Sequence, residues 1–301
     1  MVVSLIWLGA VLIAYSLMAA MLWTLLWWFR RSGAGRRSPL ARNLLRERGD
    51  SLRTELEDID ADLVGICCLL LTAPLIVYSS WITQVHFSAA GNSPARLVGL
   101  AGASIVISGI ALVWLLRVLA RRRSLRLGLD GELAVGQELN QLMQKGYAVF
   151  HDVPGERFNI DHVVVSQAGV FAVETKARPK AITHDPKADA EVVYDGRTLR
   201  FPTWESAEYL EQAVRQAAWL SRWLTSAVGE PVGARPVLAL PGWYIKRVQR
   251  GSVEVINGRD ANYLARSGDV RLSASLIQRI VHQLDARCRT VEPRAYRRVG
   301  S

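Results

Sequence analysis

The chain has 301 residues, carries a formal net charge of +10 and is half hydrophobic, with a positive mean hydropathy of +0.14. Positive hydropathy together with a large charge predicts that apolar and charged residues are segregated along the chain. The cysteines exclude a disulfide framework and a cysteine zinc site, because Cys67 and Cys68 are adjacent and Cys288 stands alone. A basic excess of this size favours polyanionic partners without identifying one.

Three apolar runs occupy the first 120 residues. Residues 2–29 carry no charge, and residues 63–87 and 97–116 contain no Asp, Glu, Lys or Arg. About 20 apolar residues suffice to cross a bilayer as a helix. We therefore expect a membrane anchor over residues 1–120 with three transmembrane helices in contact with the lipid bilayer. The lack of charges within the spans favours anchoring over transport.

Arginines set the expected orientation of these spans. They follow the first and third runs, whereas the loop between the second and third runs has Arg96 alone. Because Lys and Arg concentrate on the cytoplasmic side, the pattern predicts a multi-pass protein of the inner (plasma) membrane with its N-terminus outside. Residues 30–62 and everything after Arg117 are then cytoplasmic. The arginines that follow the runs are Arg30, Arg31, Arg36, Arg37, Arg121, Arg122 and Arg123.

Residues 121–288 have the pattern of a soluble domain, and residues 289–301 form a basic tail. After an arginine-rich linker over residues 121–126, Asp130 is a candidate N-cap for a helix that ends before Gly146. Strands are predicted at residues 148–153, 235–240 and 252–256, and a hairpin at residues 191–201 that turns at Asp195-Gly196. Helices are predicted at residues 205–227, 260–266 and 274–287. This order predicts an α/β domain with a mixed central β-sheet flanked by helices.

A hairpin predicted over residues 159–176 carries the candidate chemistry. Glu174 and Lys176 share a strand face, and the end of the second strand folds back beside Asp161. Two carboxylates suit a hard divalent cation, with the backbone carbonyl of Thr175 as a third oxygen. The cation would acidify a bound water, and Lys176 would stabilise developing negative charge. The alternative is a surface ion pair between Glu174 and Lys176, worth under ~1 kcal/mol.

Glu132 lies on the helix that precedes this hairpin. It shares one helix face with Gly136, Leu139 and Met143. Glu132 is therefore either an acid on the inward side, close to the carboxylates, or an exposed first-turn glutamate favoured by the helix dipole. The local sequence leaves both interpretations open.

Gln212 and His162 are further polar residues near the predicted site. Gln212 lies on a polar helix face with Gln216 and Arg215. This face either contacts phosphate or substrate or is simply solvated. His162 neighbours Asp161 but points to the opposite face of the strand, so we interpret it as structural.

Several blocks of the soluble part follow one another in a recognisable order. They are Gly131-Glu132, Gly146-Tyr147, residues 159–165, Gly169-Val170-Phe171, residues 173–176, residues 212–220 and residues 235–241. Together they resemble the nuclease-related domain, NERD, over about residues 125–240. One departure is that Glu208-Tyr209 stands where family members often carry Asn-Pro ahead of the helix glutamine.

The resemblance implies the PD-(D/E)xK nuclease superfamily and a restriction-endonuclease-like core. It also implies a role for each matching position. Glu132 would be the helix acid, Asp161 and Glu174 the metal ligands, Lys176 the catalytic lysine, and Gln212 a helix residue near the site.

These patterns predict a membrane-anchored, cytoplasm-facing nuclease that depends on Mg²⁺ (or Mn²⁺). It would hydrolyse phosphodiester bonds in nucleic acid, with DNA favoured over RNA. An alternative of a different class is a nucleic-acid-binding or signalling module that keeps the nuclease-like fold and does not cleave. A third is a membrane scaffold whose soluble domain recruits partners.

Overall fold

The computed structural model describes residues 42–87, 94–181, 188–259, 264 and 271–293, together with 17, 20, 21, 23–25, 27, 28, 39 and 40. Most of the predicted span over residues 2–29, the predicted helix over residues 260–266 apart from Leu264, and the tail beyond residue 293 lie outside the described residues. The chain divides into two compact units. One includes Val64–Leu115, and the other consists of Leu44–Leu63 and Leu116–Val291.

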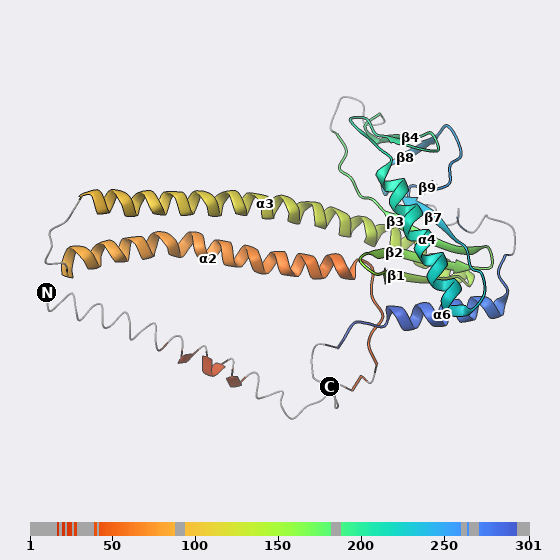
Figure 1. Ribbon diagram of the computed structural model, residues 1–301, viewed down its shortest axis with the longest axis horizontal. Helices are drawn as coiled ribbons and strands as arrows, with labels where there is room; N and C mark the ends of the chain where they lie inside the picture. Colours follow the sequence, from red (N-terminus) through yellow and green to blue (C-terminus); the bar gives the residue numbers. More distant parts are fainter. Residues whose placement is uncertain are drawn as a thin grey trace. The chain divides into compact units, whose positions relative to one another are not determined.

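Two long helices, α2 (Asp50–Phe87) and α3 (Pro94–Asn140), run side by side in opposite directions (Figure 1). Both are long and apolar enough to cross a membrane, and the predicted spans over residues 63–87 and 97–116 lie within them. Large apolar side chains in these stretches are exposed, including Leu71 at 72% and Ile105 at 73%. Exposed apolar surface of this extent is typical of proteins that contact a membrane or a partner.

α3 continues without interruption through residues 121–130, where the sequence predicts a linker and an N-cap at Asp130. Both predictions are wrong, because the stretch is rich in Arg and Leu, which are strong helix formers, and Gly128 alone does not stop the helix. A 3₁₀ turn, η1 (Gln141–Lys145), follows and ends at Gly146, whose φ is 82°. The turn breaks the predicted helix face, so Met143 is exposed and does not point inward.

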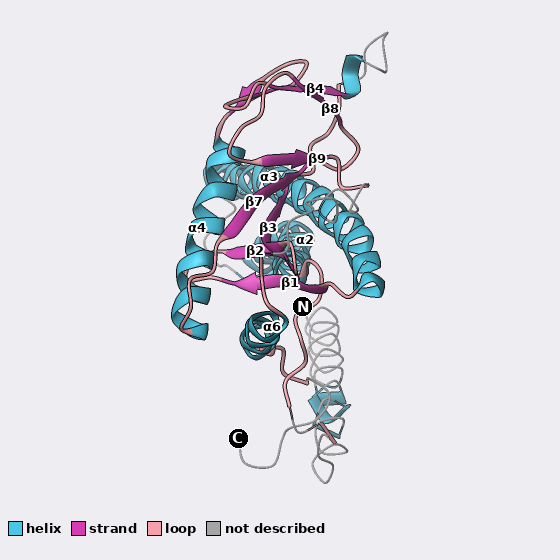
Figure 2. Cartoon of the chain, turned by 90° about the vertical axis from the view of Figure 1, so that its right-hand side faces the viewer, coloured by secondary structure: helices cyan, strands magenta, loops and turns pink. Residues whose placement is uncertain are grey.

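The second unit is built on a five-stranded sheet in the order β1-β2-β3-β7-β9 (Figure 2). The strands are β1 (Ala148–Pro154), β2 (Asn159–Ser166), β3 (Gly169–Thr175), β7 (Ala234–Ala239) and β9 (Glu254–Ile256). β1, β2 and β3 pair antiparallel, whereas β3, β7 and β9 pair parallel, so the mixed sheet is confirmed. His162 pairs with Val173, which confirms the hairpin over residues 159–176.

Helices cover both faces of this sheet. α4 (Glu208–Val228) and α6 (Ala274–Cys288) lie on one face, where Val163 packs in a cluster with Leu220 and Ile280. The C-terminal part of α3 lies on the other face, where Val164 packs in a cluster with Leu139. Successive residues of β2 therefore face opposite layers, as the two-residue repeat of a strand requires.

A smaller sheet in the order β6-β5-β4-β8 packs against the first turn of α4. Its strands are β4 (Glu191–Tyr194), which follows the 3₁₀ turn η2 (Ala188–Ala190), β5 (Leu199–Arg200), β6 (Glu205–Ser206) and β8 (Tyr244–Arg247). β4 and β5 form the predicted hairpin at Asp195-Gly196, and Gly196 has a φ of 91°. β8 is not predicted, because its four mostly exposed residues contain no apolar run.

Residues 44–63 belong to the second unit, although the sequence places them in the connection between spans. Asp152 on β1 accepts hydrogen bonds from Arg46 Nε at 2.8 Å, from Arg46 Nη2 at 2.6 Å and from the backbone N–H of Ser51 at 2.9 Å. Leu44 pairs with Val291 in an isolated bridge. These contacts join the start of α2 to the central sheet.

Candidate active site

Asp161 and Glu174 lie next to each other on the central sheet. Because His162 pairs with Val173, Asp161 and Glu174 are neighbours across the β2–β3 ladder, on the face that α4 covers. Glu174 is 2% exposed. Asp161 Oδ2 accepts a hydrogen bond from the backbone N–H of Thr175 at 2.6 Å. The hairpin thus brings two carboxylates to the carboxyl end of β3.

The two oxygens of Glu174 have different surroundings. Oε1 accepts hydrogen bonds from Lys176 Nζ at 2.5 Å and from Gln212 Nε2 at 2.6 Å. Oε2 is buried and has no hydrogen-bond partner in the part of the chain that the structure describes. A buried carboxylate oxygen without a donor is costly, and a cation ligated by this oxygen would offset that cost.

Glu132 belongs to the same site. It lies in the C-terminal part of α3, beyond residues 97–116, and is 9% exposed. Burial raises the pKa of Glu132 to about 8, with contributions from the charges of Asp152 and Glu174. Burial, followed by the charges of Glu174 and Glu132, also raises the pKa of Asp161 well above its ordinary value. The interpretation of Glu132 as an exposed first-turn residue is therefore wrong.

Glycines let α3 approach the sheet closely enough to deliver Glu132. A Cβ added at Gly131 would lie 2.5 Å from Cβ of Ala177, the residue after Lys176. A Cβ added at Gly136 would overlap Cδ of Arg48 and lie 3.2 Å from Cε1 of His162. Larger residues at either position would push the helix away from the end of β3.

The residues present fit a hard divalent cation. Burial and the charge of Glu174 raise the pKa values of Glu132 and Asp161, and a cation at the buried Oε2 of Glu174 would offset the negative charge of this site. Among the described residues no group of three or more His, Cys, Asp or Glu side chains is placed to hold a metal ion. Two carboxylates with the Thr175 carbonyl, completed by water and phosphate, are the ligands that Mg²⁺ usually takes.

His162 lies on the opposite face of β2 from the carboxylates, beneath α3. Its Nδ1 lies 2.9 Å from Nδ1 of His151, and Nε2 of His151 lies 2.8 Å from Oδ1 of Asn140. Because the Asn140 oxygen only accepts, His151 carries its proton on Nε2 and His162 donates from Nδ1. Burial lowers the pKa of His162, so this pair is a neutral packing element between α3 and the sheet.

The polar face of α4 is divided between two environments. Gln212 binds Glu174, and Gln216 is buried and donates to the backbone oxygen of Asn159 at 3.2 Å. Arg215 is exposed and forms a surface ion pair with Glu211 at 3.6 Å. Both glutamines therefore face the sheet, whereas the arginine faces solvent.

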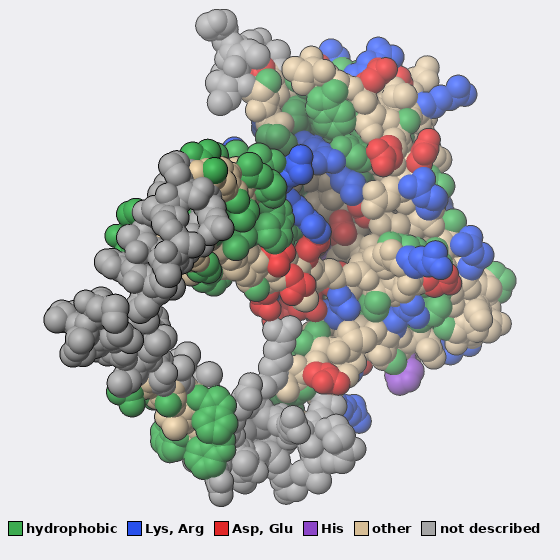
Figure 3. Space-filling model, turned by 60° about the vertical axis from the view of Figure 1, so that its left-hand side comes forward, with side chains coloured by type: hydrophobic (Ala, Val, Ile, Leu, Met, Phe, Trp, Pro, Cys, Tyr) green, Lys and Arg blue, Asp and Glu red, His purple; other side chains and the backbone are tan. Residues whose placement is uncertain are grey.

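Tyr209 and Arg178 also lie beside the site and are missing from the sequence prediction. The Arg178 Nε donates to the Tyr209 hydroxyl at 2.6 Å, and Lys176 Nζ lies 5.7 Å from the centre of the Tyr209 ring. The available signal was the two-residue repeat of Lys176, Arg178 and Lys180 after the strand. In Figure 3, Lys and Arg side chains gather beside Asp and Glu side chains on the face that is drawn.

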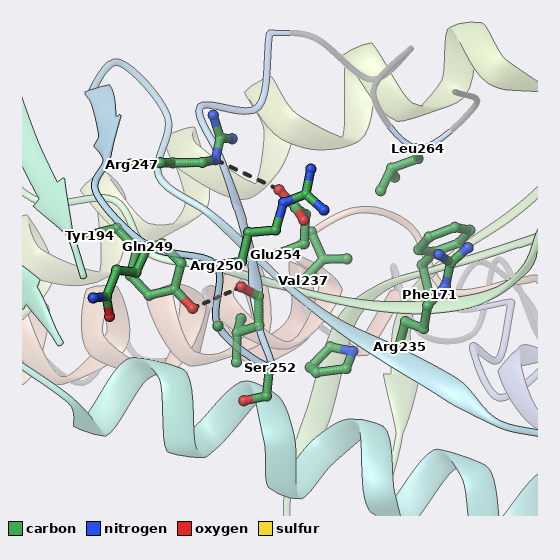
Figure 4. A pocket seen from close by; sticks show the side chains of 13 residues that line it. Phe171, Tyr194, Arg235, Val237, Arg247, Gln249, Arg250, Ser252, Glu254 and Leu264 are labelled. Atoms are coloured by element: carbon green, nitrogen blue, oxygen red, sulfur yellow. Dashed lines mark hydrogen bonds and ion pairs between the residues drawn. The ribbon is translucent and has the colours of Figure 1, made fainter. Parts of the chain in front are cut away.

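A cavity of about 680 Å³ lies elsewhere, on the face of the sheet that carries Phe171 and Val237 (Figure 4). It is lined by Arg235, Arg247 and Glu254, among others, and by none of the five predicted site residues. The Arg235 guanidinium lies 4.1 Å from the centre of the Phe171 ring, and Arg247 pairs with Glu254 at 3.7 Å. These arginines have partners within the protein, so the carboxylate site remains the candidate centre.

Comparison with known proteins identifies the domain that contains this site. Residues 127–241 match the family model of the nuclease-related domain, NERD, and all five predicted site residues fall within the match. This part of the chain is therefore a nuclease-related domain, as the resemblance over about residues 125–240 implies. No curated protein and no solved structure matches the chain.

Proposed function

We propose that this protein is a metal-dependent nuclease that hydrolyses phosphodiester bonds in nucleic acid, with DNA as the favoured substrate. The supporting observation is the arrangement around Glu174. Lys176 and Gln212 hold Oε1, while the buried Oε2 is left without a donor beside Asp161. A structural ion pair on the surface would not leave such an atom buried.

Each site residue has a role in this proposal. Asp161 and Glu174, with the Thr175 carbonyl, would hold Mg²⁺ or Mn²⁺. When bound, the ion supplies positive charge at the scissile phosphate and lowers the pKa of water. Lys176 stabilises the charge that develops on the phosphate oxygens and orients the attacking water. Gln212 fixes the orientation of Glu174 through its 2.6 Å hydrogen bond.

Glu132 has a separate role because it is protonated at neutral pH before a cation binds, since its pKa is about 8. A neutral carboxyl can donate a hydrogen bond next to the carboxylate pair.

We propose in addition that the protein is anchored in the inner membrane with the nuclease-related domain in the cytoplasm. Support comes from the two apolar helices, from the uncharged run over residues 2–29 and from the arginines that follow the first and third runs. The cytoplasm supplies both Mg²⁺ and nucleic acid. The division of the chain into membrane anchor (1–120), domain (121–288) and tail (289–301) is part of the same proposal.

The test uses the full chain in detergent, because residues 44–63 pack within the same compact unit as the site. Single- and double-stranded DNA and RNA are incubated with Mg²⁺, Mn²⁺ or a chelator. Wild-type protein is expected to cleave only with a divalent ion, and Lys176→Ala should lose about 10²–10³-fold in rate.

The matched control is Lys246→Ala, which removes an exposed lysine paired with Glu191 at 3.5 Å on the smaller sheet. Its rate should equal that of wild type. Retention of metal-dependent cleavage by Lys176→Ala would contradict the proposal, because the activity would then come from a contaminant or another site. Salt-sensitive nucleic-acid binding without cleavage by wild type would instead identify a non-cleaving binding module.

A further inference from the structure

Cationic side chains continue outward from the candidate active site along the segment after β3. The cations occupy every second position, at Lys176, Arg178 and Lys180. The exposure of their side chains increases away from the strand. Lys176 is the inner member, with a side chain 21% exposed and paired with Glu174. Arg178 and Lys180 are exposed. The three cations form a row that begins at the catalytic carboxylates.

Aromatic rings lie beneath this row and keep its members on one side. The Arg178 guanidinium lies 5.1 Å and Lys176 Nζ 5.7 Å from the centre of the same Tyr209 ring. Lys180 Nζ lies 5.7 Å from the centre of the Trp243 ring. Contacts of this geometry are attractive, because the ring face is negative. The cations therefore project together rather than alternating between two faces.

Tyr209 fixes the middle cation most closely. Tyr209 is 8% exposed, and its ring packs edge-on against Trp204 at a centroid distance of 5.8 Å. Its hydroxyl accepts the 2.6 Å hydrogen bond from Arg178 Nε. This bond uses Nε, and the two terminal nitrogens of the guanidinium provide a fork of the kind that binds phosphate oxygens.

The outer two cations have no acidic partner among the described residues. Lys176 is neutralised by Glu174, whereas neither Arg178 nor Lys180 forms an ion pair with a described carboxylate. A row of unneutralised cations next to a carboxylate centre is suited to an extended polyanion, not to a single small phosphate. Residues two positions apart in an extended segment lie ~6.8 Å apart. Two phosphates of one nucleic-acid strand take up about the same length along the helix axis.

We propose that Arg178 and Lys180 bind the backbone phosphates that adjoin the scissile phosphate, and that Tyr209 positions Arg178 for this contact. The substrate class is then a continuous polynucleotide strand, recognised through its backbone without base specificity. The inference rests on the proposed nuclease function for its catalytic readout, but its binding readout is independent of cleavage.

The binding test compares wild type with Arg178→Ala, Lys180→Ala and the double variant as full chains in detergent. Binding of a fluorescent DNA oligonucleotide is measured with a chelator present, over a range of salt concentrations. Each lost phosphate contact should reduce the slope of log Kobs against log salt by about 0.7 for single-stranded or 0.9 for double-stranded DNA. The double variant should lose about twice that amount.

Arg222→Ala is the matched control, because Arg222 is exposed on α4 and lies ten residues beyond Gln212, ~15 Å along the helix. Its slope should equal that of wild type. An unchanged slope in the double variant, an equal change in Arg222→Ala, or absence of oligonucleotide binding by wild type would overturn the inference.

The catalytic test separates backbone contacts from chemistry by using two substrates. On a DNA oligonucleotide the double variant should raise KM with little change in kcat, whereas on bis-p-nitrophenyl phosphate it should match wild type. Tyr209→Phe, which removes only the hydroxyl, should raise the oligonucleotide KM by less than Arg178→Ala does. An equal loss on both substrates would overturn the inference. If wild type cleaves neither substrate while the slopes change as expected, only the nuclease proposal fails.

Discussion

Asp152→Asn is expected to weaken the junction between residues 44–51 and the central sheet. Asp152 is 3% exposed and has a φ of 49°, a conformation that among non-glycine residues Asn and Asp adopt most readily. Asparagine therefore keeps the shape and the backbone conformation, removes the charge and replaces one acceptor oxygen with an amide N–H donor. The Arg46 guanidinium then loses its buried counterion, which lies 2.6 Å away.

The expected cost follows from burial. Removing one partner of a buried ion pair costs ~3–5 kcal/mol, whereas an exposed pair contributes ~1 kcal/mol or less. The Arg46 side chain is 18% exposed and the amide oxygen of the new asparagine would still accept one hydrogen bond, so the lower figure, ~3 kcal/mol, applies. Asp152→Ala should cost a further ~1–2 kcal/mol for the left-handed backbone, and Asp152→Gly should not incur this further cost.

Cys288 offers an assay confined to this unit. It is the last residue of α6 and is 1% exposed, and its backbone oxygen accepts a hydrogen bond from the N–H of Arg46 at 2.9 Å. With Cys67 and Cys68 replaced by serine in the full chain, thiol labelling follows the open population of this unit. A loss of ~3 kcal/mol should raise the labelling rate about 10²-fold, since ~1.4 kcal/mol corresponds to a factor of ten.

Asp60→Asn is the matched control, because Asp60 also pairs with an arginine, Arg122, at 2.6 Å, but its side chain is 52% exposed. It should change the labelling rate less than about fivefold. Labelling of Asp152→Asn within about threefold of wild type, or equal rates for the two asparagine variants, would refute the assignment of Asp152 as the anchor of this junction.

Three further predictions concern the candidate active site. Gly131→Ala should lower kcat, because the added Cβ would lie 2.5 Å from Cβ of Ala177, whereas Gly128→Ala, with its nearest contact at 3.5 Å, should leave kcat unchanged. In metal-free protein the free energy of unfolding should fall as pH rises from 4.5 to about 8, because folded Glu132 keeps a proton that the unfolded chain releases. Urea titrations should show that Glu132→Gln reduces this slope by up to ~1.4 kcal/mol per pH unit, and an unchanged slope would exclude Glu132 as its source. Gln212→Ala should raise the Mg²⁺ concentration for half-maximal cleavage about 10–100-fold, since Glu174 loses its 2.6 Å hydrogen bond, and an unaltered Mg²⁺ titration would contradict that role.

Sequence patterns predicted the elements whose signals are local. The hairpin over residues 159–176, the Asp195-Gly196 turn and the amphipathic α4 all follow from short-range periodicity and turn chemistry. The helix start predicted at Asp130 was wrong because the local helix propensity of the preceding residues was overlooked. An N-cap residue begins a helix only where the preceding chain is not itself helical, and residues 121–129 favour the helix.

Contacts between distant parts of the chain could not be predicted in this way. The hydrogen bonds of Arg46 and Ser51 with Asp152 join residues about a hundred positions apart, and no motif marks either end. The hydrogen bond from Arg178 to Tyr209 likewise joins a strand exit to a helix start. Such pairs depend on how layers pack, which a single sequence does not display.

By itself, the sequence determined that Asp161 and Glu174 would be neighbours, because the two-residue repeat and the short turn leave one register that buries both strands. It did not determine whether Glu132 belongs to the site. Only the tertiary structure decided that, by packing Gly131 against Ala177 and enclosing the carboxyl group beside Glu174. Burial and like charge act through space, so they exist only once the helix lies against the sheet.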